Sequence, residues 1–268
     1  MGNIRESNKD SRKKYFFFDI DGTIAIGMPR YIPESTEYAL NKLKENGHFI
    51  SVATGRMYTM AKDFCDQFGI SNMVTDGGYG TVLDGKIDIK PLDKQMMIDI
   101  VDVFEENNIP WAICLADERV WHTKDKRFYD IMKRETKNYM DTIIDRDLDI
   151  RKVKDVFKGF ACIDVELESK LDALKNVTYT RYSPSYIIIE PDDKSLGIRK
   201  VMDLMGIEDQ DVVVFGDNTN DIKMFRPEWT SIAMGNAVKE LKEIADFVTK
   251  DADDGGIEYA CRHFGWID

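Results

Sequence analysis

The sequence predicts an α/β protein, in which a doubly wound, Rossmann-like parallel sheet is interrupted by an inserted α+β cap domain. Short apolar runs alternate with helical segments through the first third of the 268 residues. The pattern then changes to short alternating strands, and the first rhythm returns after residue 190. Because strands that alternate with helices are typical of parallel sheets, we expect the two outer parts to form one discontinuous domain.

The first third contains three predicted strands separated by two helices. The run YFFFDI is rich in aromatic residues and too short for a helix, which favours a central strand. Pro33 begins a helical segment that Gly47 ends, with Ala39, Leu40 and Leu43 on one face. The segment continues with a buried strand in HFISVAT, a helix in MYTMAKDFCDQFG and a strand in NMVTDGG.

The middle of the chain, residues 82–190, is predicted to form the inserted cap. The stretch GTVLDGKIDIK consists of two alternating runs around Asp84-Gly85, which indicates a hairpin. The rest is predicted to hold a helix near 93–107, strands near 110–122, a helix near 125–140, a strand in GFACIDVE, a short helix in SKLDALKN and paired strands in VTYTRYSPSYIIIE. This antiparallel material differs from the parallel rhythm on either side.

The parallel rhythm resumes with a helix in DDKSLGIRKVMDLMG, strands in DVVVFGD and TSIAMG, and a helix in NAVKELKEIAD. The core is therefore expected to comprise residues 15–81 and 191–268, with residues 1–14 as a polar tail. This tail lacks the apolar stretch of a signal peptide, and Glu6 breaks the myristoylation pattern. No run approaches 18 apolar residues, so we expect a cytoplasmic protein with no membrane partner.

Composition narrows the classes of ligand. The formal net charge is −12, so the average field would repel nucleic acids, and an anionic substrate needs a local device such as a metal ion. The four cysteines are widely separated and form no CxxC pair. Neither a disulfide framework nor a zinc site is indicated, and reduced buried thiols are expected.

Polar residues follow several predicted strands. Ligands of open parallel sheets bind beyond the carboxyl ends of the strands, where this chain places Asp19, Asp21, Thr54, Gly55, Arg56, Asp217, Asn218, Asn220 and Asp221, with Lys194 opening a helix nearby. On a strand, Asp19 and Asp21 would project from one face, where two charges ~4 Å apart repel by about 1–4 kcal/mol. Their combination at one sheet edge favours a functional site.

Each of these signals also has an ordinary structural explanation. The DIDGT segment could be a solvated turn, Thr54 a helix N-cap, and Lys194 a surface residue. An EF-hand loop beginning at Asp217 is excluded, because Thr219 stands at its third position and Ile222 replaces the required glycine. The joint order and placement of the signals weigh against these separate explanations.

With these elements together, the sequence resembles the haloacid dehalogenase superfamily, and more narrowly its Cof-type sugar phosphatases with a subclass IIB cap. DIDGT is similar to the first motif, ATGR to the second, Lys194 to the third and GDNTND to the fourth. The closing SIAMGNAVKELKEIADFVTKDADDGGI resembles the C-terminal signature of the subfamily. Two departures are Asp76-Gly77-Gly78, where many relatives have Asn-Gly, and Lys194-Ser195-Leu196-Gly197 in place of Lys-Gly.

The resemblance implies a Mg²⁺-dependent phosphatase that acts on small phosphorylated metabolites, sugar phosphates above all, through an aspartyl phosphate. It implies that Asp19 is the nucleophile, that Asp21 is a general acid and then a general base, and that Asp217 binds Mg²⁺ with Asp19 and the Asp21 carbonyl. It further implies phosphate contacts from Ile20, Thr54, Gly55, Lys194 and Asn220, and a supporting role for Asp221 behind Lys194 or a metal-bound water.

Other functions stay open beside this one. A phosphomutase of the same superfamily would pass the phosphoryl group to another sugar hydroxyl, and a non-catalytic regulator would keep only the fold. A phosphorylated receiver domain is disfavoured, because its acceptor Asp ends the third strand. In the cap, Trp111, Trp121 and His122 face either a sugar or, for the tryptophans, the cap core. A small-molecule substrate and a monomer or small homo-oligomer are expected.

Overall fold

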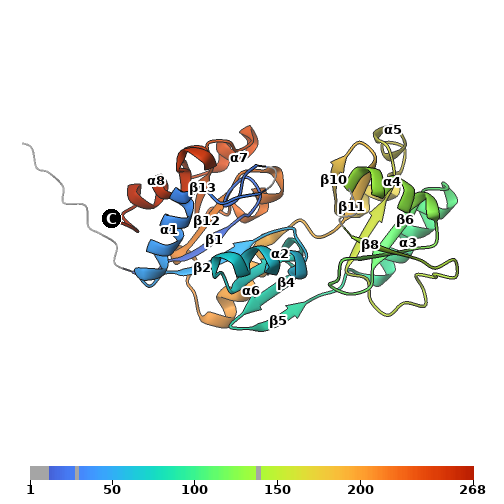
Figure 1. The fold of residues 1–268 in the computed structure, drawn as a ribbon, viewed down its shortest axis with the longest axis horizontal. Helices are drawn as coiled ribbons and strands as arrows, with labels where there is room; N and C mark the ends of the chain where they lie inside the picture. Colours follow the sequence, from blue (N-terminus) through green and yellow to red (C-terminus); the bar gives the residue numbers. More distant parts are fainter. Residues whose placement is uncertain (1–11, 28–29, 137–139) are drawn as a thin grey trace, which may run out of the picture.

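The computed structural model describes residues 12–27, 30–136 and 140–268, so most of the predicted polar tail lies outside the described residues. The described chain forms two domains joined by two crossings of the backbone (Figure 1). One domain is built on an eight-stranded sheet and the other on a six-stranded sheet. The predicted fold class, a doubly wound parallel sheet with an inserted α+β cap, is confirmed.

The core sheet has the strand order β14-β13-β12-β1-β2-β3-β4-β5. Pairing is parallel from β14 to β3 and antiparallel from β3 to β5. The strands are β1 (Tyr15–Phe18), β2 (Phe49–Ala53), β3 (Asn72–Thr75), β4 (Gly80–Leu83), β5 (Lys86–Ile89), β12 (Val212–Gly216), β13 (Thr230–Ala233) and β14 (Phe247–Val248).

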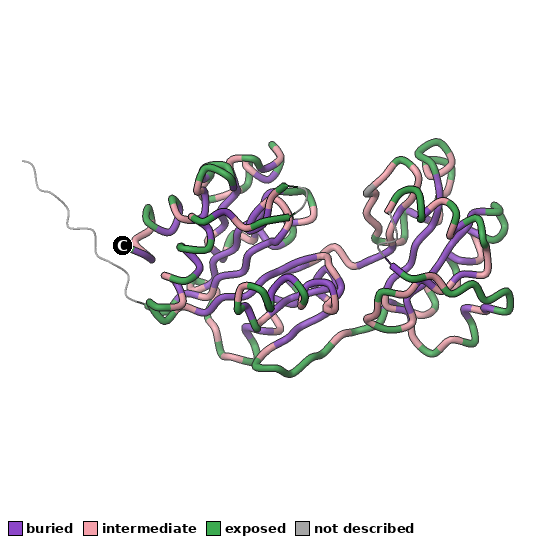
Figure 2. The backbone as a smooth tube through the Cα atoms, viewed as in Figure 1, coloured by how far each residue is buried: buried purple, intermediate pink, exposed green. Residues whose placement is uncertain are grey.

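The centre of this sheet is β1, which lies between β2 and β12. Phe16, Phe17 and Phe18 are all fully buried, so the strand is apolar on both faces. A parallel sheet covered by helices on both faces requires this continuous apolar run in place of alternation. Figure 2 shows the buried segments running together through the core domain. The covering helices are α1 (Glu34–Glu45), α2 (Tyr58–Cys65), α6 (Lys194–Met205), α7 (Lys239–Ile244) and α8 (Gly256–His263).

The hairpin β4–β5 belongs to the core sheet, because β4 pairs with β3. The domain boundary expected at residue 82 therefore falls inside a core strand, and we place it after Ile89. The Asp84-Gly85 turn, with φ of 48° and 77°, forms as the sequence predicts. That signal identifies which two strands pair with each other, but it carries no information about the sheet that they join.

The cap sheet has the strand order β10-β11-β9-β6-β7-β8. Its strands are β6 (Trp111–Cys114), β7 (Val120–Thr123), β8 (Asp141–Ile144), β9 (Lys158–Ala161), β10 (Tyr179–Ser183) and β11 (Tyr186–Ile189), accompanied by α3 (Lys94–Glu106), α4 (Lys126–Thr136) and α5 (Val165–Glu168). The predicted strand in GFACIDVE ends early, because the Asp164 side chain accepts a hydrogen bond from the Leu167 amide at 2.8 Å and caps α5.

Two simpler expectations can be compared with the described chain. All four cysteines are buried and unbridged, as expected. Across the described ranges, no helix has both the length and the apolar composition needed to cross a bilayer.

Candidate active site

The site forms where β1 and β12 end side by side. Asp19 directly follows β1, and its amide donates to the Phe215 carbonyl at 2.9 Å. Asp217 directly follows β12, so the two carboxylates project from neighbouring parallel strands. Gly22 has a φ of +92°, and a Cβ there would lie 2.2 Å from Oδ2 of Asp217. The glycine of the DIDGT motif is therefore required for the turn to pass Asp217.

A buried lysine connects this pair to a third acid. The Nζ of Lys194 lies 2.5 Å from Oδ1 of Asp19 and 2.6 Å from Oδ1 of Asp221. Lys194 is 1% exposed, which excludes the surface-lysine explanation. Since a buried ammonium is stable only when it is paired, Lys194 and the two carboxylates form one electrostatic unit.

Asp221 is engaged on both of its carboxylate oxygens. Its Oδ2 accepts hydrogen bonds from the amides of Asp217 and Asn218 at 2.9 and 3.0 Å, while Oδ1 faces Lys194. Asp221 thus fixes the start of the loop after β12 and binds the Lys194 ammonium, which also contacts Asp19. The supporting role that the resemblance implies for Asp221 stays a prediction.

The acids of this cluster outnumber its cation. Burial raises the pKa of Asp19 to about 8 against the lowering effect of Lys194, and burial together with Asp221 raises that of Asp217 to about 7. Oxygens of Asp19, Asp217 and Asp221 all lie within 4.8 Å of one another. A compact group of buried carboxylates with too little positive charge is the donor set that suits Mg²⁺. The residues present therefore fit this ion.

The turn after β2, residues 54–56, forms the neighbouring part of the site. Thr54 is 2% exposed, and its Oγ1 accepts from the Arg56 amide at 3.1 Å. Helix α2 begins only at Tyr58, with Met57 as its N-cap, so Thr54 is not a helix cap. The Thr54 and Arg56 carbonyls accept from the Gly77 and Asp76 amides at 3.1 and 2.9 Å.

The remaining predicted phosphate contacts lie around this edge with different exposures. Ile20 is fully buried, and its carbonyl accepts from the Ala25 amide at 2.8 Å within the DIDGT turn. Asn220 is half-buried, and its Oδ1 has no hydrogen-bond partner among the described residues. An unpaired buried acceptor beside the acidic cluster is consistent with a site that awaits a ligand.

Asp21 has partners different from those of Asp19. Arg56 donates to both of its oxygens, from Nε at 2.9 Å and from Nη2 at 2.6 Å, and Arg30 Nε lies 2.7 Å from Oδ1. The Asp21 side chain is 34% exposed. The two acids of DIDGT are thus separated: Asp19 faces the buried lysine, and Asp21 faces the exposed Arg30 and the half-buried Arg56. The ATGR motif contains Arg56, but no local signal identifies Arg30 as its companion.

A cavity of about 470 Å³ lies between the core and the cap and includes Asp21. Its wall is largely apolar, and its lining residues are Asp21, Arg30, Gly55, Arg56, Met57, Met60, Trp121, Met132, Thr136, Met140, Lys158, Phe160, Tyr186, Ile188 and Glu190. Met57 and Met60 of the core pack in one hydrophobic cluster with Trp121 and Phe160 of the cap. This cavity is the space that is available to a substrate beside the acids.

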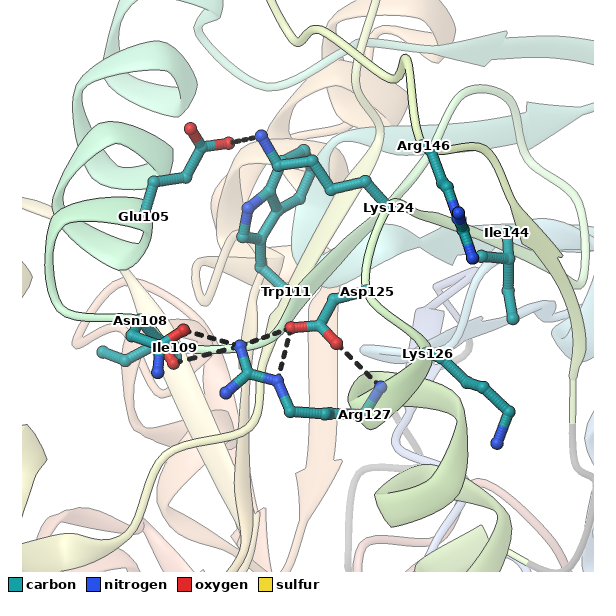
Figure 3. Close-up of a pocket in the computed structure, with 10 residues that line it drawn as sticks. All are labelled: Glu105, Asn108, Ile109, Trp111, Lys124, Asp125, Lys126, Arg127, Ile144 and Arg146. Atoms are coloured by element: carbon teal, nitrogen blue, oxygen red, sulfur yellow. Dashed lines mark hydrogen bonds and ion pairs between the residues drawn. The ribbon is translucent and has the colours of Figure 1, made fainter.

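The cap has a second cavity of about 650 Å³ on another side (Figure 3). Trp111 lies there, packed in the cap core, and so does not line the cavity beside Asp21. The lining of this second cavity carries four basic and two acidic side chains, of which Lys124 pairs with Glu105 and Arg127 pairs with Asp125. None of the predicted catalytic carboxylates lines it, so its larger volume does not mark the reaction site. His122 is half-buried, and its Nε2 lies 3.4 Å from Oε1 of Glu118.

Asp76 is a buried acid beside the site that the sequence marks only as a departure from its relatives. It is 2% exposed, and neither of its carboxylate oxygens has a hydrogen-bond partner among the described residues. Burial raises its pKa to about 6, although Lys158 lowers it. The adjacent Gly77 and Gly78 are required by close packing, since a Cβ on either would lie within 2.0 Å of the Pro191 or Asp193 carbonyl oxygen.

We expect the substitution Asp76→Asn to stabilise the protein in a pH-dependent way. The folded-state pKa near 6 exceeds the ordinary value of 3.8, so the wild type loses stability as the pH rises between these values. The advantage of asparagine should therefore grow from pH 4 to pH 6 and then level off at roughly 2–3 kcal/mol. Urea unfolding at about pH 4.5 and at about pH 7.5 measures this difference in the free energy of unfolding. An advantage that is equal at both pH values would contradict the assignment.

Comparisons with known proteins identify relatives along most of the chain. The family model of haloacid dehalogenase-like hydrolases matches residues 16–260. The "Putative phosphatase YkrA" of Bacillus subtilis (strain 168) is 31% identical over 258 residues, covering 95% of this chain and 98% of its own. The 5-amino-6-(5-phospho-D-ribitylamino)uracil phosphatase YitU of the same organism is 23% identical and covers 89% and 93% of the two chains.

A solved structure also matches most of the chain. The HAD subclass IIB sugar phosphatase BT4131 superposes with a TM-score of 0.76 at 25% sequence identity. The match covers 95% of this chain and 100% of that one, so it includes both the core and the inserted cap.

Proposed function

Since the chain belongs to the haloacid dehalogenase-like hydrolases and is a phosphatase of that superfamily, we propose that it hydrolyses small phosphorylated metabolites with Mg²⁺ through an aspartyl phosphate on Asp19. Sugar phosphates are the first substrates to be expected. The observation that carries this proposal is the buried chain of Asp19, Lys194 and Asp221 beside Asp217. It supplies a nucleophile, a fixed cation and a cation-binding cluster at one sheet edge.

The first half of the reaction forms the covalent intermediate. An oxygen of Asp19 attacks phosphorus, and the bond to the leaving alcohol breaks. Lys194 balances the phosphoryl charge while it stays anchored by Asp221, and Thr54 with the Gly55 amide holds phosphoryl oxygens. A bound Mg²⁺ ion supplies charge neutralisation between the anionic nucleophile and the anionic substrate.

Asp21 moves protons in both halves of the reaction. It donates a proton to the leaving alcohol and later accepts one from the water that attacks the aspartyl phosphate. In the structure, Arg30 and Arg56 together engage both oxygens of this carboxylate. Because proton transfer to the leaving oxygen needs one of these oxygens, at least one arginine contact must give way when a substrate enters.

The cavity beside Asp21 bears on the choice of substrate. Five of its apolar residues, Met57, Met60, Met132, Met140 and Phe160, are at most 9% exposed, and their surfaces offer packing instead of hydrogen bonds. The ring of Trp121 adds an aromatic surface to the same wall. This lining supports a leaving group that adds an apolar or ring-shaped part to a polyol. The relative YitU is named for such a compound, 5-amino-6-(5-phospho-D-ribitylamino)uracil, which we therefore propose as a substrate beside simple sugar phosphates.

The test is a panel of phosphate esters with the purified protein. We expect release of inorganic phosphate that requires Mg²⁺ and stops in excess chelator, from sugar phosphates, p-nitrophenyl phosphate and the ribitylamino-uracil ester. Formation of an isomerised sugar phosphate without free phosphate would favour a phosphomutase instead. Absence of turnover on the whole panel, with the protein folded and Mg²⁺ present, would favour a non-catalytic protein.

A further inference from the structure

Lys158 of the cap lies where three parts of the chain meet. It is the first residue of β9, and it is 5% exposed. Its Nζ donates to the Gly55 carbonyl at 3.0 Å and lies 2.6 Å from Oε2 of Glu190. Gly55 belongs to the core turn after β2, whereas Glu190 follows β11 in the second crossing between the domains. One side chain thus connects the cap, the crossing and the core.

The turn that Lys158 reaches has three successive carbonyls held from outside. The Thr54 carbonyl accepts from the Gly77 amide at 3.1 Å, and the Arg56 carbonyl accepts from the Asp76 amide at 2.9 Å. Both donors are core backbone. The middle carbonyl, that of Gly55, accepts a hydrogen bond from Lys158. The cap therefore donates one of the three hydrogen bonds that hold these carbonyls.

The same turn carries groups that the reaction needs. Its Gly55 amide is one of the proposed phosphate contacts, and Arg56 donates two hydrogen bonds to Asp21. Lys158 and Glu190 also line the cavity that contains Asp21. A small displacement of this turn would therefore move two groups together: the Gly55 amide, a proposed phosphate contact, and Arg56, the partner of Asp21.

Stability alone does not account for a charged pair in this place. Replacing a buried ion pair by apolar residues is often neutral or stabilising, whereas removing one partner is costly. Burial would lower the pKa of Lys158, but Glu190 and Asp76 raise it above the ordinary value, so the ammonium remains charged. Asp117 is a further acid in its field. A charged lysine is thus maintained at the turn.

We propose that Lys158 is a positioning residue, through which the docked cap fixes the phosphate-binding turn at Gly55. Turnover then depends on the cap even for a substrate that is too small to contact the cap wall. This role rests on the proposed phosphatase function. It differs from recognition of the leaving group, which would affect large substrates alone.

The experiment compares Lys158→Met with the double variant Lys158→Met/Glu190→Gln. Methionine removes the charge at similar length, and the second change removes the carboxylate that would otherwise lose its buried cation. We expect Lys158→Met to lower both the thermal midpoint and kcat. The double variant should regain the thermal midpoint while kcat for acetyl phosphate and p-nitrophenyl phosphate stays about 10- to 100-fold low. Calorimetry should show weaker binding of inorganic phosphate by about the same factor.

Arg119→Met is the matched control. Arg119 also connects the cap to the core, through Asp63 and the Thr59 carbonyl of α2, but it does not reach the turn. We expect its kcat to stay within about twofold of the wild type. Recovery of both stability and kcat in the double variant would overturn the proposal, as would a loss confined to large substrates or an equal loss in Arg119→Met.

Phosphate binding separates this proposal from the proposed function. If the wild-type protein shows no turnover but binds inorganic phosphate with Mg²⁺, the phosphatase assignment fails, and weaker binding by the double variant still supports the role of Lys158. If the double variant binds phosphate as tightly as the wild type, the role of Lys158 fails even where the phosphatase assignment holds. If the wild type neither turns over nor binds phosphate, both are overturned.

Discussion

Asp19→Asn is expected to abolish phosphatase activity, with a loss of at least about 10³-fold in kcat. An amide oxygen is a poor nucleophile and cannot form the aspartyl phosphate. It also cannot balance Lys194, whose Nζ lies 2.5 Å from Oδ1 of Asp19. Steady-state release of phosphate from p-nitrophenyl phosphate with Mg²⁺ measures the effect.

The folded state of this variant should survive the change. Burial raises the pKa of Asp19 to about 8, so a neutral side chain of the same shape is well accommodated there. Asp84→Asn is the matched control, because Asp84 lies in a hairpin turn with a φ of 48°, which asparagine tolerates. We expect it to keep activity within about twofold. Turnover by Asp19→Asn near that of Asp84→Asn would contradict the assignment of the nucleophile.

Lys194→Met is expected to cause the largest loss of stability together with a loss of activity. Removing the ammonium leaves Asp19 and Asp221 buried without their shared partner, which costs about 3–5 kcal/mol when both remain charged. Burial raises the pKa of Asp19 to about 8 even beside Lys194, so this carboxyl is largely neutral in both proteins below that pH, and the loss of stability should grow as the pH rises from about 7 to about 9. Urea unfolding at these two pH values measures it.

Lys200→Met on the same helix provides the control for Lys194→Met. Lys200 pairs with Asp88 at the surface, where an ion pair contributes about 0–1 kcal/mol. Its replacement should therefore change the free energy of unfolding little at either pH. A free energy of unfolding for Lys194→Met that matches the Lys200→Met value at about pH 9 would show that Lys194 does not hold the two acids in place.

The sequence predicts the parallel core well because its signals are local and strong. The short apolar run of Phe16 to Phe18 favours a strand buried on both faces, and Gly47 marks the end of α1. The weak signals are the short and exposed elements. Strand β8 (Asp141–Ile144) was not predicted, since two of its isoleucines are 48% and 43% exposed and no alternation is visible in four residues.

The residues of the site likewise divide into those that the sequence predicts and those that it does not. The predicted residues Asp19, Asp217, Asp221 and Lys194 come together because parallel strands bring their carboxyl ends to one edge. What the sequence could not give are contacts between distant segments. Arg30 and Arg56 meet Asp21 only through the fold of the turns, and Lys158 reaches Gly55 across 103 residues of chain. A lone lysine in a strand carries no signal of such a partner.

The central claim is that Asp19 carries the phosphoryl group during turnover. The most direct measurement is acid quenching of the protein during reaction with a substrate and Mg²⁺, followed by protease digestion and mass spectrometry. We predict one added phosphoryl group on the peptide that spans Asp19 and Asp21, with fragmentation placing it on Asp19 and with no addition in Asp19→Asn. Turnover without any phosphorylated peptide, or with the phosphoryl group on another residue, would contradict the account.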